Sequence, residues 1–295
     1  MAFVSCTKDF AEAENGSVSK KADKNYYSLT VTGILNDTRV ACDNEGKLSW
    51  EAKDSIGLVL VGRDESGEED SNIDVCAKTD EAACKTGTFT AGNVSVVSGK
   101  LYAYYPYTPY NNPEWKAGSC FPNKDYDGVP TVNENSAWVV LKQGQHQSAA
   151  NAQEFGKYFT MAAPGVDFSA TQPASLSFSP LASVLCFDIY DTSAKYTTEN
   201  IRNVVATILN DSDTPLVGGY KYDLVEKNFD FTTGGRRLAA NIIVDTPFAV
   251  PAASGQGLLY MAVLPGTRTL KITVNTDCGS HVFTMTNPLT STAAK

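Results

Sequence analysis

Residues 27–32 read Tyr27-Ser28-Leu29-Thr30-Val31-Thr32, an alternation of apolar and polar side chains. Successive side chains of an extended strand point to opposite faces, so this period of two puts Tyr27, Leu29 and Val31 on one face. A turn-forming run, Asp43-Asn44-Glu45-Gly46, follows soon after. The stretch therefore predicts a half-buried β-strand at the start of the folded body.

Strand patterns of this kind recur along the chain, and turn residues separate them. The clearest apolar run is Ile56–Val61. Further strands are expected at 48–50, 94–97, 101–107, 138–141, 175–178, 184–190, 204–209, 216–224, 229–232, 241–244, 258–264 and 270–274. Many short strands spaced by turns favour an all-β chain built from antiparallel β-sandwiches.

Other segments lack a strand pattern. The acidic residues of 63–74 predict a solvated loop, and the Pro, Asn, Gly and Asp residues of 108–136 predict a long ordered excursion. Single helical turns are expected at 149–155 and 199–203. We therefore expect a lipoprotein signal remnant and a flexible tether over residues 1–25, one β-sandwich domain over residues 26–173 and a second over residues 174–295.

Composition and charge exclude several classes of function. The 295 residues carry a formal net charge of −9, which argues against a nucleic-acid partner, because such proteins normally present a basic surface. The sequence contains no G-x-S-x-G, H-E-x-x-H, C-x-x-C or P-loop motif. The two histidines, His146 and His281, stand in polar or strand-like surroundings without an evident catalytic partner. We expect no enzymatic activity and no cofactor, unless calcium binds.

The chain opens with Met1-Ala-Phe-Val-Ser5-Cys6, a short apolar stretch that polar residues follow at once. This stretch resembles the end of a bacterial lipoprotein signal peptide, with Cys6 as the lipidated residue. The alternative is an ordinary cytosolic start. If Cys6 is acylated, six cysteines remain, and only Cys76 and Cys84 are close enough in sequence to suggest a local disulfide.

One loop has the ligand spacing of a calcium site. Oxygen-bearing side chains stand at loop positions 1, 3, 5 and 12, with Gly128 at position 6, as in an EF-type loop. The four candidate ligands are Asn123, Asp125, Asp127 and Glu134. The alternative, which we favour, is a surface turn cluster of Asn, Asp and Gly residues.

The segment Leu101-Tyr-Ala-Tyr-Tyr-Pro-Tyr-Thr-Pro-Tyr110 is rich in tyrosine. Its rings could form a platform that stacks on sugar rings. The candidate glycan contacts are Tyr104, Tyr105, Tyr107 and Trp115. Packing of one strand face into a sandwich core explains the same pattern, and we favour it.

Several short segments together resemble the fimbrillin-like family of Gram-negative anaerobes. They occur in the family's order over nearly all of residues 26–275. The segments are Leu48-Ser-Trp50-Glu-Ala-Lys-Asp54-Ser-Ile-Gly57, Tyr102-Ala-Tyr-Tyr-Pro-Tyr107, Tyr158-Phe-Thr-Met161-Ala, Leu176-Ser-Phe178-Ser-Pro-Leu-Ala-Ser-Val, Gly218-Gly-Tyr-Lys-Tyr222 and Ala262-Val-Leu-Pro265. The sequence departs from the family at Ser179, where His is common, and at Lys53, where Gly is common.

The resemblance implies two tandem transthyretin-like sandwiches, export as a lipoprotein and a role as a type V pilus subunit at the cell surface. In that family an Arg- or Lys-specific protease removes the first strand, and a neighbouring subunit's strand fills the groove. Arg39 is the residue best placed for this cut. The implied partners are other pilus subunits and the outer membrane, through the lipid anchor.

A second hypothesis differs in class from the first. It is a monomeric outer-membrane lipoprotein that binds a host or microbial glycan, or a protein ligand, through the aromatic patch. Polymer formation would distinguish the pilus subunit from this glycan-binding lipoprotein.

Overall fold

The computed structural model describes residues 25–35, 49–80, 85–107, 136–148, 155–156, 158–210, 213–231 and 237–293. These residues form an all-β structure, and their only helical geometry is a short 3₁₀ turn at Phe155, Gly156 and Tyr158. Within these ranges, no helix has the length and apolar character that a membrane crossing requires. The all-β class expected from the sequence is confirmed.

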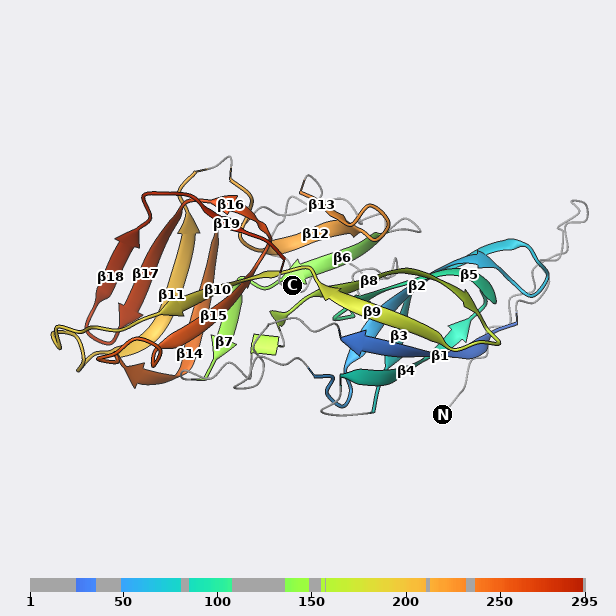
Figure 1. Cartoon of the computed structure of the whole chain (residues 1–295), viewed down its shortest axis with the longest axis horizontal. Helices are drawn as coiled ribbons and strands as arrows, with labels where there is room; N and C mark the ends of the chain where they lie inside the picture. Colours follow the sequence, from blue (N-terminus) through green and yellow to red (C-terminus); the bar gives the residue numbers. More distant parts are fainter. Residues whose placement is uncertain are drawn as a thin grey trace, which may run out of the picture.

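Seven strands form a closed barrel, which lies on the right in Figure 1. In barrel order they are β1 (Tyr27–Leu35), β4 (Thr86–Val94), β3 (Glu69–Lys78), β2 (Ser55–Arg63), β5 (Ser98–Tyr105), β8 (Met161–Ser169) and β9 (Ala174–Pro180). All neighbours pair antiparallel except β1 and β9, which are parallel and close the barrel.

The remaining strands form a second group, on the left and centre of Figure 1. Its five-stranded sheet has the order β18 (Ser280–Thr284), β17 (Leu270–Thr276), β11 (Asn200–Ile208), β14 (Ala239–Ala249) and β7 (Gly144–Gln147). A three-stranded sheet joins β13 (Asn228–Asp230), β12 (Gly218–Asp223) and β6 (Ser136–Leu141). Two pairs complete the group, β10 (Ser183–Asp188) with β15 (Leu258–Val263) and β16 (Gly266–Arg268) with β19 (Leu289–Ser291).

Two glutamines of β7 tie the five-stranded sheet to β15. Gln145 donates from Nε2 to the carbonyl oxygen of Ala262 at 2.7 Å and accepts from the amide of Ala262 at 2.8 Å. Gln147 accepts from the amide of Tyr260 at 2.9 Å. Both glutamines are buried, and these bonds supply the partners that a buried amide needs.

Sheet membership does not change at residue 173, where we expected the domain boundary. β9 lies beyond that residue and yet belongs to the barrel, whereas β6 and β7 precede it and pair with β12 and β14 in the second group. The buried apolar side chains of both groups form one continuous core cluster.

Two local expectations are wrong. Residues 63–74 form a hairpin and not a loop: β2 and β3 pair from Arg63 and Glu69 onward, and the turn between them is confined to 64–68. Residues 199–203 form no helical turn, because β11 starts at Asn200 and pairs with both β14 and β17.

Candidate functional site

Strand β1 and the groove that holds it are the candidate functional site. β1 pairs antiparallel with β4 on one side, from Tyr27 to Ile34, and parallel with β9 on the other side, from Val31 to Leu35. Every other strand of the barrel follows it in the chain. β1 is therefore the first strand of the described chain and also the strand that closes the barrel.

The alternation read in the sequence appears in the burial of β1. Leu29, Val31 and Leu35 are at most 5% exposed, whereas Ser28 and Thr30 face the solvent. Burial of each such apolar side chain contributes about 1.5–3 kcal/mol. The groove between β4 and β9 thus binds β1 mainly through three apolar side chains and two backbone ladders.

An aromatic cluster forms the floor of the groove below Gly33. The fully buried ring of Trp50 meets Phe89, Phe178 and Tyr105 edge-on, with ring centroids 4.9, 5.3 and 5.4 Å away. Trp50 also donates from Nε1 to the carbonyl oxygen of Gly33 at 3.0 Å. Sequence reasoning missed this contact, although glycine interrupts the apolar alternation of β1 at that position.

Further hydrogen bonds hold the two ends of β1. The hydroxyl of Tyr27 donates to the carbonyl oxygen of Val96, and burial raises the pKa of Tyr27 above its ordinary value. Ser28 donates to the carbonyl oxygen of Ala91 at 3.1 Å. At the other end, the amide of Leu35 donates to the carbonyl oxygen of Lys85 at 2.9 Å. The strand is held along its whole described length.

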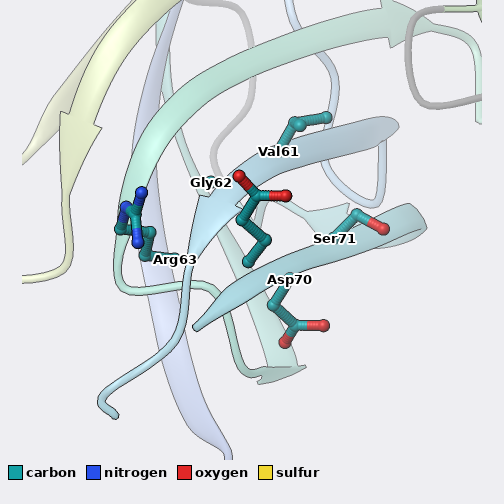
Figure 2. Close-up of a pocket in the computed structure, with 6 residues that line it drawn as sticks. Val61, Gly62, Arg63, Asp70 and Ser71 are labelled. Atoms are coloured by element: carbon teal, nitrogen blue, oxygen red, sulfur yellow. The ribbon is translucent and has the colours of Figure 1, made fainter. Parts of the chain in front are cut away.

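A separate depression of about 580 Å³ lies where β2 and β3 pair near their turn. Figure 2 shows its lining, with Arg63 and Asp70 pointing to different sides. Arg63 donates to the carbonyl oxygen of Gly67 at 2.6 Å, and Asp70 accepts from the hydroxyl of Ser95 at 2.5 Å. These two charged groups are thus engaged by their own hairpin and the adjoining loop.

Of the candidate glycan contacts, three are described. Tyr104 is 2% exposed and packs in the core, so its ring has almost no surface to offer a sugar. Tyr105 and Tyr107 are partly buried against the same core, and the hydroxyl of Tyr105 donates to Asp54 at 3.1 Å. Trp115 lies outside the described residues.

The other predicted sites fall outside the described residues as well. They are the lipidation residue Cys6, the processing residue Arg39 and the calcium candidates Asn123, Asp125, Asp127 and Glu134. These assignments stay predictions. Within the described ranges, no group of three or more His, Cys, Asp or Glu side chains is arranged to hold a metal ion.

Both histidines contact carboxylates in the five-stranded sheet and its surroundings. His146 lies in β7 with Nδ1 2.7 Å from Asp245 Oδ1, and His281 lies in β18 with Nε2 2.8 Å from Glu199 Oε2. Glu199 also accepts from the hydroxyl of Thr276 at 2.6 Å. The Thr276 bond and then the His281 bond lower the pKa of Glu199. Each pair joins two segments that are distant in sequence, which is a structural role.

Comparisons with known proteins identify a similar fold and do not identify a family. No protein-family model and no curated protein matches the chain. A candidate cell adhesion protein from Bacteroides ovatus has a similar structure, with a TM-score of 0.53 and 16% identity over 90% of this chain and 89% of that one.

Two other solved structures are less similar. A candidate cell adhesion protein from Bacteroides uniformis has a TM-score of 0.45 and 14% identity, over 91% of this chain and 90% of that one. The fimbrial anchor protein Mfa2 from Porphyromonas gingivalis has a TM-score of 0.32 and 11% identity, over 83% and 78%. The fold conclusion rests on the Bacteroides ovatus protein alone, and the chain has a fold similar to that candidate cell adhesion protein.

Proposed function

We propose that the chain is a structural or adhesive subunit of a bacterial surface fimbria, exported as a lipoprotein and assembled by donor-strand exchange. The observation that carries the proposal is the position of β1, the first described strand, in a groove between β4 and β9. The likeness in fold to a candidate cell adhesion protein supports the same reading. In this proposal the chain performs no catalysis.

Arg39 stands four residues after the end of β1. Cleavage there would separate β1 from the rest of the barrel while leaving β2 to β9 on one chain. Loss of β1 would leave the facing backbone groups of β4 and β9 without partners and would expose the aromatic floor to water. An incoming strand from another subunit would again pair with β4 and β9 and cover the aromatic floor. The exchange would therefore cause no net loss of backbone hydrogen bonds.

The shape of the groove determines which side chains a donor strand must have. Apolar side chains should stand at the positions of Leu29, Val31 and Leu35, because these point into the core. A glycine or another very small residue should stand at the position of Gly33, because the ring of Phe89 packs against the backbone there. In our proposal Cys6 carries the lipid that holds the precursor at the outer membrane until assembly.

The experiment is digestion of the folded chain with an arginine-specific protease, followed by N-terminal sequencing and electrophoresis in SDS without heating. We expect a new terminus at Val40 and a ladder of polymers, and we expect an Arg39→Ala variant to give neither. Protection of Arg39 in the folded chain, or equal polymerisation of Arg39→Ala, would exclude this assembly route. A separate Cys6→Ala variant tests the anchor, because it should leave the membrane fraction.

A further inference from the structure

Strand β18 is an edge strand of the five-stranded sheet and is outermost in Figure 1. Within the described residues it pairs with β17 alone. It nevertheless exposes two large apolar side chains, with Val282 58% and Phe283 59% accessible to solvent. An exposed apolar edge strand is a ready template for pairing with another strand.

The hairpin geometry identifies which backbone groups face outward. The amide of Thr276 donates to the carbonyl oxygen of Gly279, and the amide of Met285 donates to the carbonyl oxygen of Leu270. Every second residue from Gly279 to Met285 therefore directs its backbone N–H and C=O groups at β17. The groups in between, those of Ser280, Val282 and Thr284, point away from β17. Each of these three residues presents one N–H donor and one carbonyl acceptor at the edge.

The side chains of β18 carry no fixed charge. Its sequence is Ser280-His-Val-Phe-Thr284, and it has none of the lysine, glutamate or proline residues that usually protect a sheet edge from pairing. His281 pairs with Glu199, and its ring meets that of Tyr196 at 4.6 Å between centroids. These contacts hold the strand in place, so it is already in the conformation that a second strand would need.

Phe283 extends an apolar surface that begins in the core. It stands directly opposite Ile272 of β17, and His281 stands opposite Val274, which is 4% exposed. Opposed residues of an antiparallel pair share a face, so Phe283 lies on the same sheet face as the buried Val274. The core-facing side of the sheet therefore continues one strand beyond the part that is covered.

We propose that β18 is a self-association edge, at which β18 of a second copy of this chain adds antiparallel around a two-fold axis. The strand is complementary to itself when Val282 faces the second copy's Val282. In that register Ser280 faces the second copy's Thr284, and His281 faces the second copy's Phe283. The three outward-facing residues then exchange backbone bonds in both directions, and no two charged side chains oppose each other.

The size of this contact limits its strength. A stable protein interface buries about 1,200–2,000 Å², and two strands of this length supply only part of that area. The dimer should therefore form with rising protein concentration and dissociate on dilution. Because no charged pair holds it, its affinity should depend little on salt. This contact is distinct from the groove of β1 and does not rest on the proposed function.

Sedimentation velocity over a range of concentrations, with the uncut chain, tests the proposal. Val282→Pro removes one outward-facing N–H and spares every bond to β17, as proline does at tolerated edge positions. Val282→Lys places two like charges opposite each other at the two-fold axis. Each variant should weaken association at least about tenfold. Val225→Lys is the matched control, because Val225 is also exposed, at 45%, but lies outside β18.

Amide hydrogen exchange supplies a readout at the level of single residues. The amides of Ser280, Val282 and Thr284 should gain protection as concentration rises, while those of His281 and Phe283 should be protected at every concentration. A parent chain that stays monomeric overturns the proposal, and so does a dimer that both Val282 variants retain. Protection of the three outward amides in the dilute monomer also overturns it, because another part of the same chain would then cover the edge.

Discussion

Gly33 is the point at which β1 comes closest to the aromatic floor of its groove. A Cβ atom added at Gly33 would lie 2.8 Å from Cε2 of Phe89 and 3.4 Å from Cε2 of Phe178. Both phenylalanines are fully buried, so neither ring can move aside without disturbing Trp50. A methyl group at this position must therefore displace either the strand or the floor.

We expect Gly33→Ala to lower the free energy of unfolding by about 1–3 kcal/mol, the usual cost of overpacking a core. Gly92→Ala in the neighbouring β4 is the matched control, because a Cβ at Gly92 meets nothing within 4 Å. This control should change stability by no more than about 0.5 kcal/mol. Urea unfolding of both variants measures the difference. Equal stability of the Gly33→Ala and Gly92→Ala variants would show that the aromatic rings in the floor of the groove move aside at little cost in free energy.

Arg268 is an unusual buried residue. Its side chain is 1% exposed, and one nitrogen donates to the carbonyl oxygen of Leu264 at 2.6 Å. Nε and Nη1 have no hydrogen-bond partner in the described structure. Burial lowers the pKa of Arg268 to about 10, and attraction to Asp213 opposes this shift only in part. A buried charge with so few partners costs folding free energy.

Arg268→Met should therefore leave stability unchanged or raise it by about 1 kcal/mol, because it fills much of the same volume without a charge. Arg268→Ala removes the charge but also leaves a cavity, and it should cost about 2–4 kcal/mol. Thermal unfolding of the two variants at neutral pH separates these effects. If the methionine variant were as unstable as the alanine variant, the guanidinium would be contributing more than its one hydrogen bond to Leu264 suggests.

At the scale of elements, the turn from β10 to β11 depends on Asp191. Its carboxylate accepts from the hydroxyl of Ser193 at 2.6 Å, from the amide of Ser193 at 2.9 Å and from the amide of Tyr196 at 2.8 Å. These bonds, the Ser193 hydroxyl first, lower the pKa of Asp191 to about 2. Because the folded-state pKa is below the ordinary value of 3.8, ionised Asp191 stabilises the folded state above that pH.

We expect Asp191→Ala to lower the melting temperature at neutral pH. The difference from the parent should shrink as the pH falls from about 4 toward 2, where the carboxylate gains a proton in the folded chain as well. Glu226→Ala is the control, since Glu226 is an exposed residue in a turn after β12. This control should change the melting temperature at neutral pH only slightly. A difference for Asp191→Ala that stays constant with pH would contradict the assigned role.

The elements also show what sequence could and could not predict. The period of two in β1 correctly predicts which face of the strand is buried, because Leu29 and Val31 are both buried. In β11 a bulge between Ile201 and Asn203 shifts the alternation, so Ile201 and Val204 are both buried three residues apart. A local sequence pattern does not reveal such a bulge, which is why the sequence predicts a helical turn over 199–203 where β11 begins.

β3 was missed for another reason. Its first residues are polar, and a polar acidic run predicts a loop when it is read alone. In the structure, Asn72 accepts from the amides of Ser95 and Val96, both at 2.9 Å, and the backbone pairs with the apolar strand β2. A distant partner therefore determines the strand, and propensity within the segment does not.

At the scale of the whole molecule, the groove of β1 could be predicted only in part. The sequence pattern indicates a first strand, and the family resemblance implies that cleavage at Arg39 could release it. The sequence did not indicate that β1 would close a barrel against β9, some 140 residues later in the chain. It also did not indicate that β6 and β7, which lie between β5 and β8 in the chain, would pair with strands of the second group. Such long-range pairings depend on the packing of the whole core, which continues through both groups.

Because β1 completes a closed barrel, a replacement strand should bind only where it reproduces the pattern of burial. After cleavage at Arg39, a labelled peptide with the sequence of Tyr27–Leu35 should exchange into the groove, whereas the uncut chain should not take it up. The proposal predicts different effects of two neighbouring substitutions in this peptide. Val31→Lys would bury a charge, because Val31 is fully buried, and should abolish uptake.

Thr30→Lys, one residue away, would point to solvent and should be taken up nearly as well as the parent peptide. Fluorescence polarisation of the labelled peptides measures uptake, with the uncut chain as the blank. Equal uptake of the two lysine peptides would mean that binding does not use the core-facing side of the groove. Uptake of the parent peptide by uncut chain would mean that β1 detaches without cleavage, and the role assigned to Arg39 would then be wrong.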